Sequence, residues 1–124
     1  ELFSNQESIR VVDQASNGVE AYEMVKKYKP DVLVLGLLMP KMDGLDAFNL
    51  IMDEYPLPTI IISEIGPQNT DTSVLALLLG AFDYIIKPGG IGAKDLTRFK
   101  EELLYKVLLA AQSQIRRIIE EENL

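Results

Sequence analysis

The sequence contains no cysteine and no histidine among its 124 residues. Without cysteine, the chain cannot form a disulfide, a thiolate nucleophile or a cysteine-ligated zinc or iron–sulfur site. Without histidine, it has no Ser-His-Asp triad, no imidazole base and no histidine-ligated metal. Many catalytic mechanisms depend on these two side chains, so we expect that the chain is not an enzyme.

Basic residues are also few, because 12 lysines and arginines stand against 19 acidic residues, for a formal net charge of −7. Nucleic acid phosphates require a surplus of positive charge, so we expect no nucleic-acid partner. The longest apolar runs, residues 32–39 and 74–82, are far shorter than the ~20 residues that span a bilayer, so we expect no membrane span. No basic stretch followed by an apolar core begins the sequence, and we therefore expect a cytoplasmic location.

The composition that remains, 48% hydrophobic and 25% charged, is typical of a folded domain. Short apolar, β-branched runs alternate with segments of helical period. The runs predict strands at residues 9–12, 31–35, 59–63 and 82–86. The periodic segments predict helices at residues 21–28, 45–55, 72–79 and 94–122, with Pro30 and Gly80 ending the first and third. This alternation predicts a three-layer α/β fold, in which helices flank a parallel sheet.

The last predicted helix is long, and its apolar stripe continues almost to the end of the sequence. The stripe consists of Leu96, Phe99, Leu103, Val107, Ala111, Ile115 and Ile118. We expect residues 1–124 to form a single domain, with a core at residues 9–92 and a long C-terminal helix at residues 93–122.

Five short motifs occur in a fixed order: NGVEA at 17–21, KPDV at 29–32, LMPKMDG at 38–44, GAFDY at 80–84 and KP at 87–88. Together they resemble the receiver domain of two-component response regulators. The stretch KPGG at 87–90, running into Leu96 and Glu101-Glu102-Leu103, is most similar to the receiver of a chemotaxis protein-glutamate methylesterase. The resemblance covers residues 9–111.

The resemblance implies a flavodoxin-like sheet of order 2-1-3-4-5 with its site at the carboxyl ends of the strands. In this family a carboxylate that ends the third strand accepts a phosphoryl group from a histidine kinase. Mg²⁺, held by that carboxylate and by an acidic pair after the first strand, neutralises the phosphate charge. A Ser or Thr on the fourth strand and a Lys on the fifth strand then bind the phosphoryl oxygens.

The residues of this sequence match that site only in part. Ser63 and Lys87 stand at the hydroxyl and lysine positions, and the carbonyl of Leu38 stands at the family's backbone ligand. Gly36 stands where the family has its phosphoacceptor aspartate. Because glycine has no side-chain oxygen, the resemblance implies a degenerate receiver with no catalytic residue and no bound Mg²⁺.

The same side chains are also consistent with purely structural roles. Lys87 is equally consistent with an ordinary charge at a strand end, or with an ion pair to Asp13 or Glu64. Ser63 is consistent with a hydroxyl that bonds to the backbone. Asp43 is expected to cap the following helix.

The family's first strand and its acidic pair have no counterpart, because residues 9–15 align with the family's second strand. The flanking strands would then expose unpaired backbone groups. Three repairs are open: residues 9–13 pair directly with residues 32–35, a second copy completes the sheet, or the natural protein is longer than this chain.

Residues 74–79 are apolar on nearly all sides, which is typical either of a deeply buried helix or of a partner surface. In receivers this helix, the fifth strand and the last helix form the common dimer or output face. We expect a partner interface that comprises Val74, Leu75, Leu78, Ile115, Ile118 and Ile119.

The sequence therefore predicts a pseudo-receiver, a protein-interaction module of two-component or chemotaxis-type signalling that forms homo-oligomers. The alternative is the truncated regulatory domain of a chemotaxis protein-glutamate methylesterase. A third possibility is a flavodoxin-like small-molecule binder with an open site at Gly36, Ser63 and Lys87.

Overall fold

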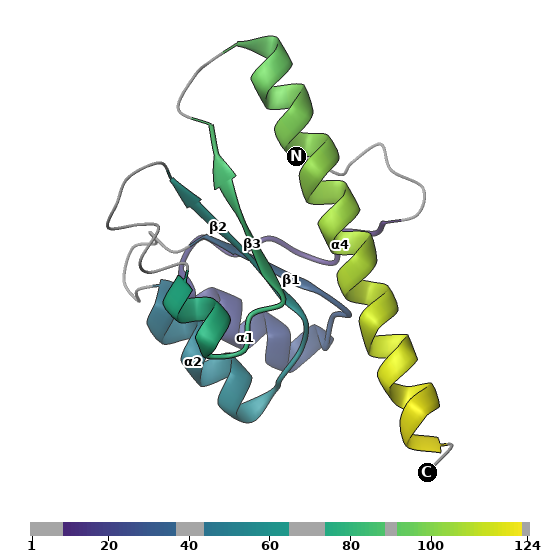
Figure 1. Ribbon diagram of the computed structural model, residues 1–124. Helices are drawn as coiled ribbons and strands as arrows, with labels where there is room; N and C mark the ends of the chain where they lie inside the picture. Colours follow the sequence, from purple (N-terminus) through teal and green to yellow (C-terminus); the bar gives the residue numbers. More distant parts are fainter. Residues whose placement is uncertain (1–8, 37–43, 65–73, 89–91, 123–124) are drawn as a thin grey trace.

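A computed structural model describes residues 9–36, 44–64, 74–88 and 92–122; the side chains of Glu64, Ala93, Lys94 and residues 114–122 are not described. The helices are α1 (Gly18–Tyr28), α2 (Gly44–Glu54) and α4 (Ala93–Glu122), and the strands are β1 (Leu33–Gly36), β2 (Thr59–Glu64) and β3 (Asp83–Lys87) (Figure 1). Residues 74–78 are also helical. Apart from residues 9–12, the elements that the sequence predicts are present within a few residues of their expected bounds.

Local sequence signals determine where two of the helices begin or end. Asn17 caps α1, because its Oδ1 accepts a hydrogen bond of 2.9 Å from the Glu20 N–H. Lys29 ends α1 in a left-handed conformation with φ +48°, and Pro30 follows it. Gly80, with φ +115°, ends the helical residues 74–78 as the sequence predicts.

The strands form a parallel sheet of order β1-β2-β3. Leu33 pairs with Thr59 at the start of β1, and Ile61 pairs with Tyr84 on the next strand. Parallel neighbours joined by helical connections confirm the predicted α/β class. This order corresponds to the part of the expected sheet that contains the third, fourth and fifth strands.

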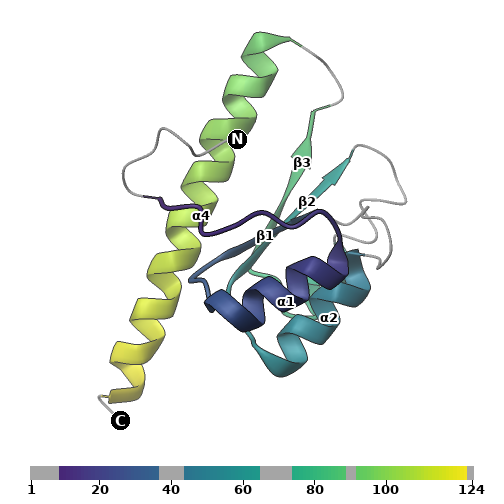
Figure 2. The same ribbon diagram turned by 180° about the vertical axis from the view of Figure 1, so that it is seen from behind.

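Two apolar clusters lie on opposite faces of the sheet. On one face, Leu35 and Ile61 pack with residues of α1 and α2, among them Val25 and Phe48. On the other face, Ile60 packs with residues of β3 and α4. Figures 1 and 2 show α4 lying across one face and the shorter helices covering the other, so the fold has three layers.

Residues 9–15 contain no strand, so the prediction of a strand at 9–12 is wrong. Ile9 packs against the cluster on the α4 face, whereas Ala15 packs against the cluster on the opposite face. The segment therefore crosses beside β1 from one face to the other and does not run along it (Figure 2). A strand exists only where a neighbour supplies its hydrogen bonds, and local sequence cannot supply that neighbour.

Helix α4 spans 30 residues, in agreement with the predicted helix at residues 93–122. Among its described side chains, the buried ones are Phe99, Leu103, Val107 and Ala110, which all pack on the sheet. Leu96 lies at the start of the predicted stripe but is 46% exposed. In the described part of the chain, no helix combines the length and the apolar character needed to cross a membrane.

Candidate functional site

The carboxyl ends of the strands meet at one edge of the sheet, as the parallel register requires. Gly36 ends β1 opposite Ile62, so Ser63 lies one residue farther along β2. Glu64, the last residue of β2, pairs with Lys87 at the end of β3. Gly36, Ser63 and Lys87 are thus brought to the same edge from separate strands. This edge is where open parallel sheets bind their ligands.

The backbone at Gly36 leaves room for a side chain. A Cβ built on this residue would meet no heavy atom within 4 Å, and its φ is not positive. Glycine is therefore not required here by either space or backbone conformation. Its consequence is chemical, because β1 ends without a carboxylate.

Ser63 is 5% exposed, and its Oγ has no hydrogen-bond partner. The alternative in which this hydroxyl bonds to the backbone is therefore wrong. A buried hydroxyl without a partner is uncommon, because its desolvation is uncompensated. Ser63 is thus the one polar group of this edge that is both buried and unsatisfied among those the structure describes.

Lys87 is exposed at the end of β3. Within the described chain no ion pair joins it to Asp13, whose Oδ1 instead accepts a hydrogen bond of 2.8 Å from the Gln14 N–H. Its alternative partner, Glu64, has no described side chain, and Leu38 and Asp43 lie outside the described residues.

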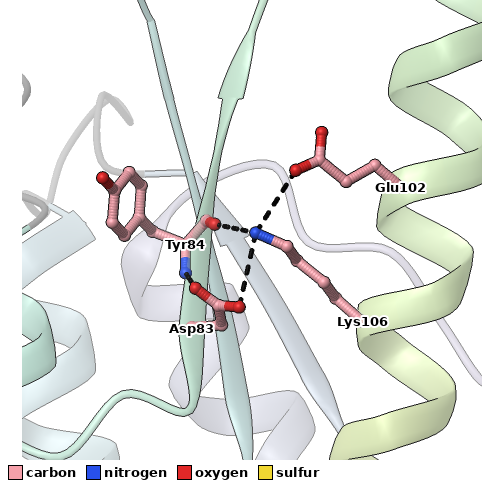
Figure 3. Close-up of polar contacts among 4 residues, drawn as sticks. All are labelled: Asp83, Tyr84, Glu102 and Lys106. Carbon is pink, nitrogen blue, oxygen red and sulfur yellow. Dashed lines mark hydrogen bonds and ion pairs between the residues drawn. The ribbon is translucent and has the colours of Figure 1, made fainter.

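A second set of polar contacts, which we did not predict from the sequence, joins α4 to β3. Lys106 Nζ lies 2.7 Å from the Tyr84 carbonyl oxygen, 3.3 Å from Asp83 Oδ2 and 3.4 Å from Glu102 Oε1 (Figure 3). The Lys106 side chain is 18% exposed. The sequence signal that could have revealed this contact is the position of Lys106 between Leu103 and Val107, at the border of the buried stripe.

The residues of the predicted interface are described only in part. Val74 is 45%, Leu75 43% and Leu78 79% exposed, so deep burial of this helix is wrong. Among the described residues of this helix, Ala76 is the one that is fully buried. The exposed residues Val74, Leu75, Leu78 and Leu79 form a surface that we term the apolar patch. The side chains of Ile115, Ile118 and Ile119 lie outside the described set.

The sheet order, the site at its carboxyl edge and the helices on both faces are those of a receiver. The sequence profile of the response regulator receiver domain matches residues 1–97. The chain therefore belongs to the response regulator receiver domain family, whose members act in signalling pathways with protein partners.

Within this family the chain is similar to the receivers of chemotaxis methylesterases. It is 42% identical over 107 residues to a protein-glutamate methylesterase/protein-glutamine glutaminase of Archaeoglobus fulgidus. It is 38% identical over 112 residues to the corresponding protein of Pyrococcus horikoshii. These matches cover 86% and 90% of this chain but only 30% of each relative. The chain is thus comparable with less than a third of these relatives.

Solved structures agree with this assignment. The response regulator domain of Thermotoga maritima CheB superposes with a TM-score of 0.78 at 34% identity, covering 90% of this chain and 83% of that one. The receiver domain of NtrX from Brucella abortus gives a TM-score of 0.65 at 27% identity, covering 84% of each chain. The chain is a CheB-like receiver domain of a signalling response regulator.

Proposed function

We propose that this receiver is degenerate: it takes no phosphoryl group on β1 and acts as a protein-interaction module in chemotaxis-type signalling. The observation that carries the proposal is Gly36, which ends β1 at the position matched to the family's acceptor aspartate. An acyl phosphate requires a carboxylate, and glycine has none. The chain itself is then not an enzyme but a binding domain.

The residues present also fit Mg²⁺ poorly. Mg²⁺ prefers carboxylate and other oxygen ligands in octahedral geometry. The family's ligand carboxylate is replaced by Gly36, and the described residues contain no group of three acidic side chains that could hold a metal. We therefore propose that signalling by this domain does not depend on Mg²⁺.

The apolar patch is the surface that we assign to partner binding, including association with a second copy of the chain. Leu78, exposed to 79%, is its most accessible side chain. Apolar side chains gathered on one exposed helix mark interaction surfaces, because their contact with water is unfavourable. The predicted extension of this surface onto Ile115, Ile118 and Ile119 belongs to the same proposal.

Incubation with acetyl phosphate and Mg²⁺, followed by intact-protein mass spectrometry, tests the proposal. We expect the unmodified mass, because no acceptor carboxylate ends β1. An active receiver treated in parallel should gain one phosphoryl group, which shows that the donor works. A phosphoryl adduct on this chain, located by peptide mapping to any aspartate, would contradict the degenerate assignment.

The relatives favour a second candidate, the regulatory receiver of a protein-glutamate methylesterase. Both matches named above are to methylesterases and cover 30% of their length. In this case the partner of the apolar patch is a methylesterase catalytic domain. The catalytic part of the Archaeoglobus fulgidus relative, immobilised alone, should then retain this chain and release the Leu78→Glu variant. Equal retention of both forms would contradict this assignment.

A further inference from the structure

The outer edge of β3 carries backbone groups that two side chains occupy. The Tyr84 N–H donates to Asp83 Oδ1 at 2.7 Å, and the Tyr84 carbonyl accepts from Lys106 Nζ at 2.7 Å (Figure 3). Lys106 Nζ also lies 3.3 Å from Asp83 Oδ2, so these two side chains contact each other. We term Asp83 and Lys106 the closing pair. A further strand would need both backbone groups of Tyr84, so the edge is closed at this residue.

Ile86 is a second residue of β3 that faces outward. Because successive residues of a strand direct their backbone groups to opposite edges, the N–H and carbonyl of Ile86 point the same way as those of Tyr84. Ile86 is 40% exposed, and among the described residues no side chain hydrogen-bonds to its backbone. β3 corresponds to the fifth and last strand of the expected receiver sheet, so the fold supplies no neighbour at this edge. Without the closing pair, β3 would therefore be a template for a further strand.

The sequence of β3, Asp-Tyr-Ile-Ile-Lys, is complementary to itself when two copies run antiparallel. With Ile85 opposite Ile85 of a second copy, Tyr84 lies opposite Ile86 and Asp83 lies opposite Lys87. Tyr84 and Ile86 then exchange N–H and carbonyl groups as a hydrogen-bonded pair. The exposed Lys87 and the partly exposed Asp83 bring opposite charges together across the two strands. Register and charge thus both favour a second copy of this chain as the occupant of this edge.

We propose that the β3 edge is a strand-addition site that the closing pair keeps closed, and that loss of the Lys106 contact lets two copies pair through this edge. In the closed form Asp83 contacts Lys106 of its own chain, whereas in the paired form it faces Lys87 of the second copy. The pairing is mutual and gives a twofold dimer that leaves neither β3 edge free. Neither the apolar patch nor the function proposed above enters this argument.

Thiol trapping tests the pairing and its register. The chain contains no cysteine, so the introduced thiols are the ones that can react. Asp83→Cys/Lys87→Cys places thiols at positions that face each other in the proposed dimer, at a spacing that a disulfide can bridge. Under mild oxidation, addition of Lys106→Met should speed formation of the disulfide-linked dimer by about tenfold or more. Either cysteine substitution alone should give no dimer, because the two thiols would then lie four residues apart along the strands.

Sedimentation equilibrium measures the effect of Lys106 without thiols. All chains, including the thiol variants, carry Leu78→Glu, so that the apolar patch does not contribute to association. We expect Lys106→Met to dimerise about tenfold or more tightly than the same chain with its lysine. Lys106→Arg keeps a donor for the Tyr84 carbonyl, and Lys100→Met changes an exposed lysine of the same helix, so both should leave association unchanged. Ile86→Pro, added to Lys106→Met, removes an outward N–H and should abolish the gain.

Three results would overturn the proposal. One is a folded Lys106→Met chain that associates no more tightly than Lys100→Met. Another is disulfide formation by Asp83→Cys alone that is as fast as with both cysteines, which would mean a different register. The third is a gain in association that survives Ile86→Pro, which would mean that another surface is involved. If Lys106→Met loses its circular dichroism signal, Asp83→Ala decides, because Asp83 is 39% exposed and its removal frees the Tyr84 N–H. No gain in association in that variant would then overturn the proposal.

Discussion

Two glycines of this chain have opposite roles, and the sequence alone does not distinguish them. Gly80 has φ +115°, and a Cβ on it would lie 3.3 Å from Met52 Cε. Gly36 has neither constraint. The helix-ending role of Gly80 was predictable from its place after an apolar helix, whereas the free space at Gly36 depends on residues distant in sequence.

Alanine at each position should therefore give different results. We expect Gly80→Ala to lower the free energy of unfolding by about 1–2 kcal/mol, because alanine at positive φ is strained. Gly36→Ala should be neutral or stabilising by about 0.5 kcal/mol, because a compatible backbone loses less entropy on folding. Urea denaturation followed by circular dichroism measures both. Equal effects of the two substitutions would contradict this distinction.

Tyr22 of α1 carries the main electrostatic perturbation among the described groups. Its hydroxyl donates a hydrogen bond to the Glu54 carboxylate of α2, which together with desolvation and the negative charge raises the pKa of Tyr22 from 10.0 to about 12. The Tyr22 and Tyr55 rings also pack at 6.1 Å between centroids. The neutral phenol is thus the form that links these two helices.

This shift predicts a late tyrosinate step. The raised pKa favours folding at every pH below 10, and this contribution is lost as the pH rises from about 10 to about 12. Ultraviolet titration should show a tyrosine that ionises near pH 12, and Tyr22→Phe should remove this late step. If Glu54→Gln leaves the late step unchanged, the carboxylate is not its cause.

At the scale of elements, the local sequence pattern was sufficient to predict β1, β2 and β3, because each is an apolar run with a partner strand in the sheet. It failed at residues 9–12, where the same composition has no partner strand. The contact between α4 and β3 was not predictable either. Lys106 lies 22 residues from Tyr84, and only the packing of Leu103 and Val107 on the sheet brings the ammonium to the strand.

Removal of this contact should loosen α4 from the sheet. We expect Lys106→Met to lower the free energy of unfolding by about 1–3 kcal/mol, mainly because the Tyr84 carbonyl loses its donor. The ion pairs contribute less, since Asp83 is 39% and Glu102 51% exposed. Urea denaturation measures the loss. Lys100→Met changes an exposed lysine of the same helix and should stay within about 0.5 kcal/mol of the wild type.

At the scale of the whole molecule, the receiver class follows from motifs that are spread along the chain. The sequence predicted a sheet with helices on both faces and brought Gly36, Ser63 and Lys87 to one edge. It could not determine the state of each residue there. The unsatisfied hydroxyl of Ser63 and the exposure of Lys87 depend on packing between segments that lie far apart in the sequence.

The surface that we assign to partners can be tested without disturbing the fold. We expect Leu78→Glu to leave the free energy of unfolding within about 0.5 kcal/mol of the wild type, because the side chain is 79% exposed. The same variant should weaken self-association through this patch by roughly tenfold, since a charge replaces an apolar contact. Analytical ultracentrifugation measures the change. Val19→Glu, at an exposed valine of α1, is the control and should have no effect.

The packing of α4 on the sheet, together with the Lys106 contact, has a mechanical consequence. Helix α4 continues to Glu122, about 24 Å along its axis beyond Lys106 at roughly 1.5 Å per residue. A tilt of about 10° around the Lys106 contact would move the far end of the helix by about 4 Å. Such a tilt would therefore move the far end of α4 more than the part that packs on the sheet. A small change in the spacing of strand and helix would then be enlarged at the end of the helix that lies farthest from Lys106.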